Sequence, residues 1–593
     1  MKKVNDLSFM VGGFAGQGVN TVANAFARLC SRAGLHVFVN LEYPSNIKGE
    51  HNYVQVMVSE EPVGSHTRPI DLLLALDAKS VVLHKDEITP GGTLIYDSEG
   101  LEVSSIDTGL EVGDIKRDDI TVIDMPIARI IKDVGGSRKM INSVGLGAIQ
   151  GLLRFEFDLL EGILRQSLAK FEEKIIEINL AGARQAYDIA REKYSKQFGI
   201  ILEKREASDR MLLTGNHAVA MGAIKAGVKF YSAYPMSPST GVLTYLSEHA
   251  RDYDMVTVLP EDEISAAGMA IGASFAGVRA MVGTSGGGFC LMTEYLGLAG
   301  IAEIPLVILE AQRPGPATGL PTRTEQGDLK FVLSAHQGDF ARIVVAPGDP
   351  AEAFYLTFEA FNLADKYQTP VIILMDKHLC ESFWTWEPFV TKGMKIDRGA
   401  MLGEKELANI GDYKRFQVTD GGVSPRTRPG VSSGVFKATG NEHNEFGLIS
   451  EDANNRAQMV EKRLRKTVSL DVSEIGVKLH GDPHADVTLV GWGSTKPVIL
   501  DAMAQLKKDH AVNCNFLQVI YMEPLPVDRV SDVFGSAERI ILIENNATGQ
   551  LGQVIMQKTG VRIDERILKY NGRQFFRDEL VDLIQQRLEE YSR

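Results

Sequence analysis

An acidic segment in the middle of the sequence holds the first side chains that suit catalysis. Glu261, Asp262 and Glu263 stand near the start of residues 260–268, which read PEDEISAAG. Acids at the start of a helix commonly interact with its dipole, and this explains Glu261 and Asp262. Glu263 differs, because it precedes a run of small residues that leaves room for a flat ligand. We therefore take Glu263 as a candidate catalytic carboxylate.

A second segment, residues 310–326, carries arginines in a stiff turn. Arg313 follows an apolar run that predicts a strand, and glycines and prolines separate it from Thr322 and Arg323. A guanidinium forms paired hydrogen bonds with a planar carboxylate. Ligands of parallel sheets bind beyond the carboxyl ends of the strands. The segment therefore indicates a site for a small carboxylic acid.

Two further segments place hydroxyl groups after expected strands. Residues 234–241 read YPMSPSTG, with Ser237 between two prolines, and residues 283–289 contain Thr284 and Ser285. A helix N-cap would account for one hydroxyl of the first segment, but not for its rigid Tyr-Pro-x-Ser-Pro frame. Because these four segments and the glycine-rich residues 12–18 all follow expected strands, we expect one shared site.

The glycine-rich residues 12–18 (GGFAGQG) separate an expected strand from an expected helix. Gly13, Gly16 and Gly18 let the backbone approach an anion, and the helix N-terminus supplies N–H groups. The pattern departs from the G-x-G-x-x-G of dinucleotide-binding folds. It is equally consistent with a tight turn and with a phosphate or adenosine-diphosphate site, to which Lys48 offers a cation.

The cysteines and histidines do not predict a metal site. No cysteine belongs to a C-x-x-C pair, which excludes a disulfide framework, a zinc finger and an iron–sulfur ligand set within the chain. We expect all the cysteines to be buried small residues: Cys30, Cys290, Cys380 and Cys514. His443 has acidic neighbours but no further ligand spacing, so we expect it in a solvated or partner-facing loop.

The composition is that of a folded protein with several domains. Its 593 residues predict three or four domains, and 44% apolar with 24% charged residues exclude a disordered or coiled-coil chain. The formal net charge of −14 disfavours nucleic acid as a partner, because phosphate binding needs a basic face. No uncharged apolar run reaches the roughly 18 residues of a membrane span. The N-terminus lacks a signal-peptide cleavage pattern, so we expect no membrane span and a cytoplasmic location.

Short β-branched runs alternate with helical patterns in three parts of the chain, which predicts three α/β domains with parallel sheets. The first comprises residues 1–195 and is followed by a polar linker at 196–210. The second spans 211–385. Regular periodicity is lost in residues 386–479, a length typical of a functional or partner-contacting arm. The third spans 480–593 and ends in an amphipathic helix.

The expected strands are residues 7–11, 36–40, 53–58, 71–76 and 93–96 in the first domain; 229–233, 255–259, 281–284, 306–310, 342–346 and 371–375 in the second; and 487–491, 512–520 and 540–544 in the third. The segments described above follow strands of the first two sheets.

Together these segments resemble a known family, the 2-oxoacid:ferredoxin oxidoreductases. The similar motifs are residues 13–18, 234–239, 260–268, 284–288 and 313–328, with GNEHNEFG at 440–447. The chain looks like the alpha subunit with the gamma part fused at its N-terminus, and its motifs are most similar to those of the 2-oxoglutarate member. The resemblance implies a gamma-like first domain, associated with coenzyme A, a thiamine diphosphate pyrimidine-binding second domain and a transketolase C-terminal-like third domain.

The family interconverts a 2-oxoacid, coenzyme A and oxidised ferredoxin with an acyl-CoA, CO2 and reduced ferredoxin. The resemblance implies that Glu263 holds N1′ of the thiamine aminopyrimidine, that Ser237 touches the oxo or carboxylate group of the substrate, and that Arg313 binds its carboxylate. Tyr234 is a further candidate substrate contact. We hypothesise that Arg323, with help from Thr322, meets the distal carboxylate of 2-oxoglutarate; the alternative is a surface arginine bonded to Glu325 or to the partner subunit. Candidate cofactor contacts are Pro235, Thr284, Ser285, Gly13, Gly16, Gly18 and Lys48.

The resemblance also implies partners. The chain has no Gly-Asp-Gly for a Mg2+–diphosphate site and no cysteine set for a cluster. A beta subunit would bring Mg2+, diphosphate binding and the iron–sulfur cluster, ferredoxin would carry electrons, and two alpha–beta heterodimers would associate. With 2-oxoglutarate as substrate, the product would be succinyl-CoA.

Several alternatives stay open at this point. The substrate could be pyruvate or another 2-oxoacid. Outside the family, the chain could be a stand-alone coenzyme A- or nucleotide-binding acyl-transfer protein, or a noncatalytic scaffold subunit. Ser237 stands where the family usually has threonine, which keeps the hydroxyl group. His217 and Glu50 also depart from the family pattern, and no role is assigned to them.

Overall fold

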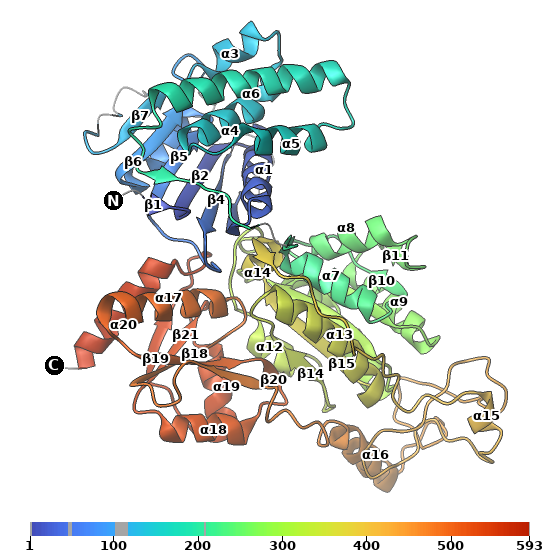
Figure 1. Ribbon diagram of the computed structural model, residues 1–593. Coiled ribbons are helices and arrows are strands. Elements are labelled where there is room, and N and C mark those ends of the chain that lie inside the picture. Colours follow the sequence, from blue (N-terminus) through green and yellow to red (C-terminus); the bar gives the residue numbers. More distant parts are fainter. Residues whose placement is uncertain (1–2, 45–49, 101–114, 116, 207–208, 592–593) are drawn as a thin grey trace. The chain divides into compact units, whose positions relative to one another are not determined.

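The computed structural model describes residues 3–44, 50–100, 115, 117–206 and 209–591. The chain forms two compact units (Figure 1). Unit 1 comprises Met1–Leu213 with two short later stretches, Ser382–Pro388 and Phe576–Asp582. Unit 2 comprises Thr214–Glu381, Phe389–Phe575 and Leu583–Arg593. Among the described residues, no helix has both the length and the apolar character needed to cross a membrane.

Unit 1 contains a mixed sheet in the order β7-β6-β5-β2-β4-β3-β16-β9. Its strands are β2 (Leu7–Phe14), β3 (His36–Glu42), β4 (His51–Ser59), β5 (Ile70–Ala75), β6 (Ile88–Tyr96), β7 (Thr121–Asp124), β9 (Met211–Thr214) and β16 (Phe383–Trp386). The expectation of a parallel sheet holds for β2, β5, β6 and β7. It is wrong for β3 and β4, which are antiparallel, because the residues that join them are too few for a crossover helix.

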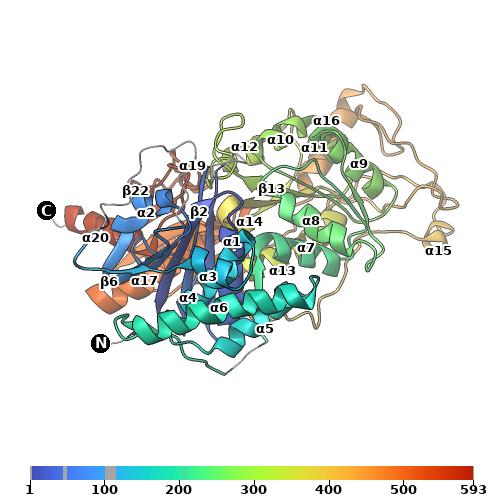
Figure 2. The ribbon, with the colours of Figure 1, turned by 90° about the horizontal axis from the view of Figure 1, so that it is seen from above.

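Helices cover both faces of this sheet. They are α1 (Val19–Arg32), α2 (Ala78–His84), α3 (Ile127–Asp133), α4 (Ile141–Leu152), α5 (Phe157–Ser167) and α6 (Glu173–Lys193). In Figure 2, α4 and α6 lie on one side of the strands and α2 on the other. A Cβ atom on Gly147 of α4 would lie 2.0 Å from the carbonyl oxygen of Ala183 on α6. Glycine therefore lets these two helices pack backbone to backbone.

The segment expected as a linker, residues 196–210, is part of unit 1 where it is described. Its strand β8 (Ile200–Ile201) pairs with β1 (Lys3–Val4). Phe198 and Leu202 are buried in the same core. The apolar residues inside this polar segment therefore pack against the first domain.

Unit 2 contains the second predicted sheet, in the order β11-β10-β12-β13-β15-β14-β20. The strands are β10 (Phe230–Ser232), β11 (Val256–Val258), β12 (Ala280–Thr284), β13 (Leu306–Gln312), β14 (Ile343–Val345), β15 (Pro370–Asp376) and β20 (Tyr521–Glu523). All are parallel except β20, which comes from the third domain and pairs antiparallel with β14. The surrounding helices are α7 (Gly215–Lys225), α8 (Thr240–His249), α9 (Glu263–Phe275), α10 (Gly286–Leu291), α11 (Thr293–Ile301), α12 (Leu329–Ser334), α13 (Pro350–Tyr367) and α14 (Lys377–Glu381).

The third domain has its own sheet, in the order β17-β19-β18-β21-β22. Its strands are β17 (Val477–His480), β18 (Val487–Trp492), β19 (Cys514–Val519), β21 (Ile540–Glu544) and β22 (Glu565–Leu568). Helices α17 (Thr495–His510), α18 (Val527–Ser536) and α19 (Gln550–Thr559) accompany them, and α20 (Arg577–Tyr591) ends the chain as predicted. The prediction of three α/β domains is confirmed.

The arm, residues 389–476, is mostly irregular and is held by buried charges. It contains α15 (Glu404–Leu407) and α16 (Ala453–Arg465). On the domain that it packs against, the fully buried Glu303 forms ion pairs with Lys462 at 2.5 Å and with Lys466 at 2.9 Å. Burial lowers the pKa of Lys466 to about 7, and Glu303 opposes this shift.

A second buried carboxylate also binds the arm. Asp365 on α13 pairs with Arg279 at 2.8 Å and with two arm residues, Arg398 at 2.9 Å and Arg426. A buried ion pair is weak evidence for stability in general, but removing one partner leaves an unpaired buried charge. The arm is therefore attached to the rest of unit 2 through charged groups that cannot easily be exposed one at a time.

Replacing Lys462 by methionine tests this attachment. Glu303 would stay buried with one cation fewer, so we expect the arm to lose about 3–5 kcal/mol of its stability. Hydrogen–deuterium exchange of residues 413–470 should become faster. Lys405→Met is the control, because Lys405 is exposed on α15, and it should stay within about 0.5 kcal/mol. Equal exchange in the two variants would show that the buried charges do not hold the arm.

Candidate functional site

Three of the segments singled out in the sequence lie at one edge of the second sheet. They follow β10, β12 and β13, which are neighbouring parallel strands. The carboxyl ends of parallel strands lie at the same edge, where ligands of such sheets bind. The fourth segment begins α9, which contacts β10, β12 and β13.

Arg313 and Ser237 are in contact at this edge. The Nη1 atom of Arg313 donates to the carbonyl oxygen of Ser237 at 2.9 Å. Burial lowers the pKa of Arg313, and the carboxylates of Asp328 and Glu263 oppose this shift. The structure therefore places a partly buried cation among Ser237, Glu263 and Asp328.

Glu263 is 3% exposed and is the first residue of α9. The N-cap role falls to Asp262, whose Oδ1 atom accepts from the backbone nitrogen of Ser265 at 2.7 Å. The Oε1 atom of Glu263 has no hydrogen-bond partner within the described part of the chain. A Cβ atom on Gly288 would lie 2.7 Å from this oxygen, so the glycine keeps the space beside it open. A buried acceptor without a donor fits the protonated ring nitrogen of a cofactor.

The hydroxyl groups near Glu263 are also buried. Thr284 and Ser285 are 0% exposed, and the Oγ atom of Ser285 has no partner among the residues that the structure describes. The Oγ1 atom of Thr284 lies 3.9 Å from the sulfur of Met236. Tyr234 and Pro235, in contrast, are exposed. Thr284 and Ser285 are therefore enclosed at the sheet edge, whereas Tyr234 and Pro235 face solvent.

Gln326 positions the loop that carries the arginines, a role that was not predicted from the sequence. It is fully buried, and all its polar groups bond to the third domain. Its backbone N–H donates to Asn545 at 2.7 Å and its Nε2 atom to the carbonyl of Trp492 at 2.7 Å. Its Oε1 atom accepts from the backbone of Asn545 at 3.0 Å, and its carbonyl accepts from Asn546 at 3.1 Å.

Thr322 and Arg323 lie on the same loop. Thr322 is buried, and a Cβ atom on Gly572 would lie 3.2 Å from the Cβ atom of Arg323. The next residue, Thr324, donates to Asp376 at 3.1 Å. The backbone at Arg323 is therefore held by the contact with Gly572 and by the hydrogen bond of Thr324.

Two carboxyl groups of this region were missed by the sequence analysis. Glu310 is fully buried near the end of β13, and Asp328 stands at the end of the arginine loop. The only sequence signal was an acidic residue inside an otherwise apolar strand (residues 306–311).

In unit 1, the glycine loop is closed by a side chain of its own. The Oε1 atom of Gln17 accepts from the backbone of Phe14 at 3.0 Å, and its Nε2 atom donates to Leu76 at 3.3 Å. Gly16 and Gly18 have φ angles of +100° and +83°. Gly18 is the N-cap of α1 and offers no side chain to the helix N–H groups. Both alternatives, a turn and an anion site, therefore remain compatible with the loop; Lys48 lies outside the described residues.

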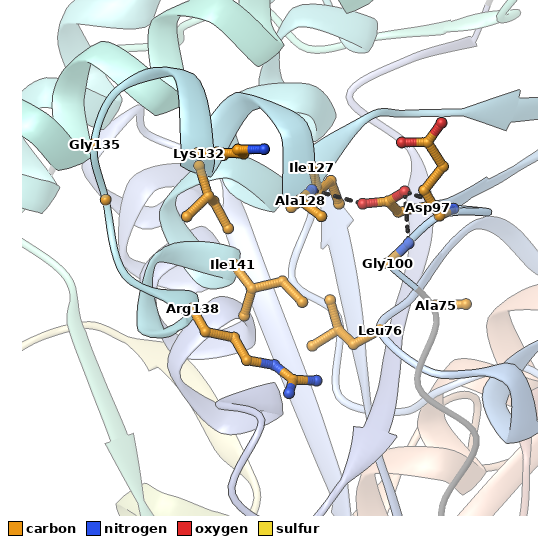
Figure 3. A pocket seen from close by; sticks show the side chains of 13 residues that line it. Ala75, Leu76, Asp97, Gly100, Ile127, Ala128, Lys132, Gly135, Arg138 and Ile141 are labelled. Atoms are coloured by element: carbon orange, nitrogen blue, oxygen red, sulfur yellow. Dashed lines mark hydrogen bonds between the residues drawn. The ribbon is translucent and has the colours of Figure 1, made fainter.

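In the sheet of unit 1, a cavity of about 590 Å³ lies at the same end as the glycine loop (Figure 3). Its apolar wall includes Leu76, Ile127 and Ile141, and two cations, Lys132 and Arg138, line it as well. Asp97 shapes its rim by accepting from the backbone nitrogens of Ala128 at 2.6 Å and Gly100 at 3.0 Å. This combination suits a ligand with both an apolar and an anionic part.

Three expectations about single residues need correction or completion. Cys290 is exposed rather than buried, since it lies on the short helix α10 at the sheet edge, whereas the other cysteines are buried. His443 is fully buried, because its ring packs 4.1 Å from Phe416 and its Nδ1 atom bonds to Asn441. His217 forms a capping box with Thr214 at the start of α7, which gives it a structural role.

Comparison with known proteins agrees with this architecture. The family model described as "Pyruvate flavodoxin/ferredoxin oxidoreductase, thiamine diP-bdg" matches residues 221–462. The model described as "Pyruvate ferredoxin/flavodoxin oxidoreductase" matches residues 8–189. The first match includes the sheet edge with Glu263 and Arg313, and the second includes the glycine loop.

Relatives cover almost the whole chain. The 2-oxoacid:ferredoxin oxidoreductase 1 subunit alpha of Sulfurisphaera tokodaii is 35% identical over 98% of this chain and 97% of its own length. The 2-oxoglutarate oxidoreductase subunit KorA of Mycobacterium tuberculosis is 26% identical over 98% and 91%. A solved 2-oxoglutarate:ferredoxin oxidoreductase from Magnetococcus marinus, with 2-oxoglutarate, coenzyme A and succinyl-CoA bound, has a TM-score of 0.90 and 30% identity, covering 98% of this chain and 99% of that one.

The fold and the matches thus define an oxidoreductase with a thiamine diphosphate-binding domain. The chain belongs to the 2-oxoacid:ferredoxin oxidoreductase family and corresponds to its alpha subunits.

Replacing Glu263 by glutamine tests its place in the site. An amide cannot stabilise a protonated ring nitrogen as a carboxylate does, so we expect exchange of the C2 hydrogen of bound thiamine diphosphate to slow by about 10²–10⁴-fold. The matched control is Glu261→Gln at the same helix start, where the exposed carboxylate accepts from Ser265 Oγ at 2.9 Å. Unchanged exchange in Glu263→Gln would remove Glu263 from this role.

Proposed function

We propose that the chain is the alpha subunit of an enzyme that interconverts 2-oxoglutarate, coenzyme A and oxidised ferredoxin with succinyl-CoA, CO2 and reduced ferredoxin. The observation that carries the choice of substrate is the pair Arg313 and Arg323 on one fixed loop. A dicarboxylate needs two cations, because a carboxylate is costly to bury without one. A monocarboxylate such as pyruvate needs only one.

The site fits thiamine diphosphate, which supplies the carbanion chemistry that splits a 2-oxoacid. Glu263 would hold the aminopyrimidine through its unpaired Oε1 atom. Pro235, Thr284 and Ser285 would shape the walls around it. Ser237 and Tyr234 would face the substrate, and Arg313 would bind its C1 carboxylate, with its orientation set by the 2.9 Å bond to Ser237.

The chain requires a partner to complete this chemistry. We propose a beta subunit that brings Mg2+, the diphosphate site and an iron–sulfur cluster, with ferredoxin as electron carrier and two alpha–beta heterodimers per molecule. The proposal is supported by the names of the relatives, which are alpha subunits. Within the described residues, no group of three or more histidine, cysteine or acidic side chains is placed to hold a metal ion.

Arg323 would bind the distal carboxylate, with Thr322 beside it. In the assembled enzyme, Arg323→Met should raise KM for 2-oxoglutarate by about tenfold or more, since one carboxylate loses a charged hydrogen-bond partner. KM for pyruvate or 2-oxobutyrate should stay unchanged or fall. Arg313→Met should impair all 2-oxoacids alike. Steady-state kinetics with each 2-oxoacid and an artificial electron acceptor provide the measurement.

Lys330→Met is the control, because this nearby cation bonds to Gln553 at 2.7 Å and not to the site. If Arg323→Met affects every 2-oxoacid equally, Arg323 does not bind the distal carboxylate. The alternative within the family, an enzyme for pyruvate or another 2-oxoacid, would then be favoured.

Coenzyme A would bind unit 1. We propose that its phosphates approach the glycine loop (Gly13, Gly16 and Gly18) and that the neighbouring cavity takes its nucleotide, with Lys132 and Arg138 as phosphate partners. The volume of about 590 Å³ lies within the ordinary range for ligand pockets. The N-terminus of α1, which has no side-chain cap, adds N–H groups at the same end of the sheet.

Arg138→Ala should therefore raise KM for coenzyme A by about tenfold, through the loss of a charged hydrogen bond. Gly16→Val should have a similar effect, because its φ of +100° disfavours a β-branched residue. The 2-oxoacid half-reaction, measured without coenzyme A, should stay normal in both. Arg129→Ala is the control, since Arg129 is 75% exposed and outside the cavity. Loss of only the half-reaction would show that these residues serve another purpose.

A further inference from the structure

Glu310 and Asp328 form a pair of carboxyl groups at the sheet edge. Glu310 is 0% exposed on β13, beside Thr284 of β12. The backbone nitrogen of Asp328 donates to the side chain of Gln312 at 3.0 Å, and Gln312 lies two residues after Glu310 on the same strand. This bond holds Asp328 beside β13, where its carboxyl group acts on that of Glu310.

Most carboxyl oxygens of the pair receive no hydrogen bond from the described residues around them. Asp328 is the N-cap residue of α12, yet its side chain makes no capping bond to the helix. Neither carboxyl oxygen of Glu310, nor Oδ2 of Asp328, has an N–H or hydroxyl donor within the described ranges. A buried carboxyl group without a donor is costly to keep ionised, and in its protonated form it can itself donate to a neighbouring carboxylate. A proton on Glu310 that is donated to Asp328 therefore satisfies both groups.

The groups around the pair also favour a protonated carboxyl group. Burial raises the pKa of Glu310 well above its usual value, and Asp328, Cys290 and Asp376 add to the shift. Burial raises the pKa of Asp328 to about 6, while Glu310 and Arg313 oppose the shift. Glu325 on the same loop also faces Asp328. Two buried carboxyl groups that interact in this way do not both ionise near neutral pH.

The pair lies against the residues of the proposed site. A Cβ atom on Gly286 would lie 2.5 Å from Oδ2 of Asp328, so the start of the Gly286–Gly288 segment rests on this carboxyl group. Asp328 and Glu263 are the two carboxylates that act on Arg313. An ionised Glu310 would add a further negative charge where an anionic substrate has to bind.

We infer that Glu310 holds the shared proton, and that the Glu310–Asp328 pair thereby sets the charge of the site in which Arg313 binds the substrate carboxylate. Glu310 is a positioning residue, because it acts through Asp328. This inference rests on the proposed function only for the identity of the substrate as a 2-oxoacid; the shared proton is independent of it.

Infrared difference spectroscopy of the full chain tests the shared proton. The wild-type-minus-Glu310→Gln spectrum should contain a protonated-carboxyl stretch that shifts in D2O. In Asp328→Asn the stretch should move to higher frequency, because the acceptor is weaker. Glu325→Gln removes a carboxyl group from the same loop and should leave the stretch in place. If Glu310→Gln removes no such stretch, Glu310 is ionised and the inference is wrong.

The pH dependence of KM for the 2-oxoacid tests the effect on the site. Asp328 is neutral below about pH 6 and ionised above it, so KM in the assembled wild-type enzyme should rise, by about tenfold at most, as pH increases through 6. Asp328→Asn should abolish this rise. In Glu310→Gln the amide donates to Asp328 as the protonated Glu310 does, so the rise should stay near the same pH.

The infrared measurement and the KM profile distinguish failure of the inference from failure of the proposed function. A KM profile that is the same in wild type and both variants would overturn the effect on the site, even if the infrared stretch is present. If the wild-type enzyme oxidises no 2-oxoacid, the proposed function fails, whereas the infrared result still decides where the proton lies.

Discussion

The four hydrogen bonds of Gln326 are the constraint on which the site in unit 2 depends. Each polar group of this buried residue is bonded to a strand-end segment of the third domain, at Trp492, Asn545 or Asn546. Arg313 and Arg323 precede Gln326 on the loop, and Asp328 follows it. Because a buried amide cannot give up these bonds without cost, they hold the loop in place. The third domain thus acts on the site through the position of this loop.

In the arm (residues 389–476), buried charged groups provide the attachment to the rest of unit 2. Its residues lack the apolar periodicity that usually holds a chain on a core, and helix α16 has a largely polar sequence. Glu303 and Asp365 bind it instead through Lys462, Lys466 and several arginines. Such pairs stabilise little compared with apolar contacts, but they tolerate few alternative arrangements. An irregular segment can therefore be well defined.

The sequence predicted those parts of the structure in which reactive side chains follow a periodic strand pattern. It predicted the three α/β domains, and it marked Ser237 and Arg313, which the fold places in contact. It did not predict the antiparallel β3–β4 pair, because a strand pattern carries no direction. Nor did it reveal Gln326, Glu310 or His443, whose burial depends on residues far along the chain. Helix α16 was not predicted from the sequence. The partner of its buried Lys462 is Glu303, which lies far away in the sequence on another element.

The division of the chain into units has a consequence for its synthesis. The first sheet needs β16, made about 170 residues after β9, to fill the place between β3 and β9. Arg68 then pairs, at 2.6 Å each, with Asp578 and Asp582 near the other end of the chain. A ribosome delivers residues in order, and domains generally fold as they emerge. The nascent N-terminal sheet therefore carries an open edge at β3 through most of translation, when unpaired strand edges are prone to aggregate.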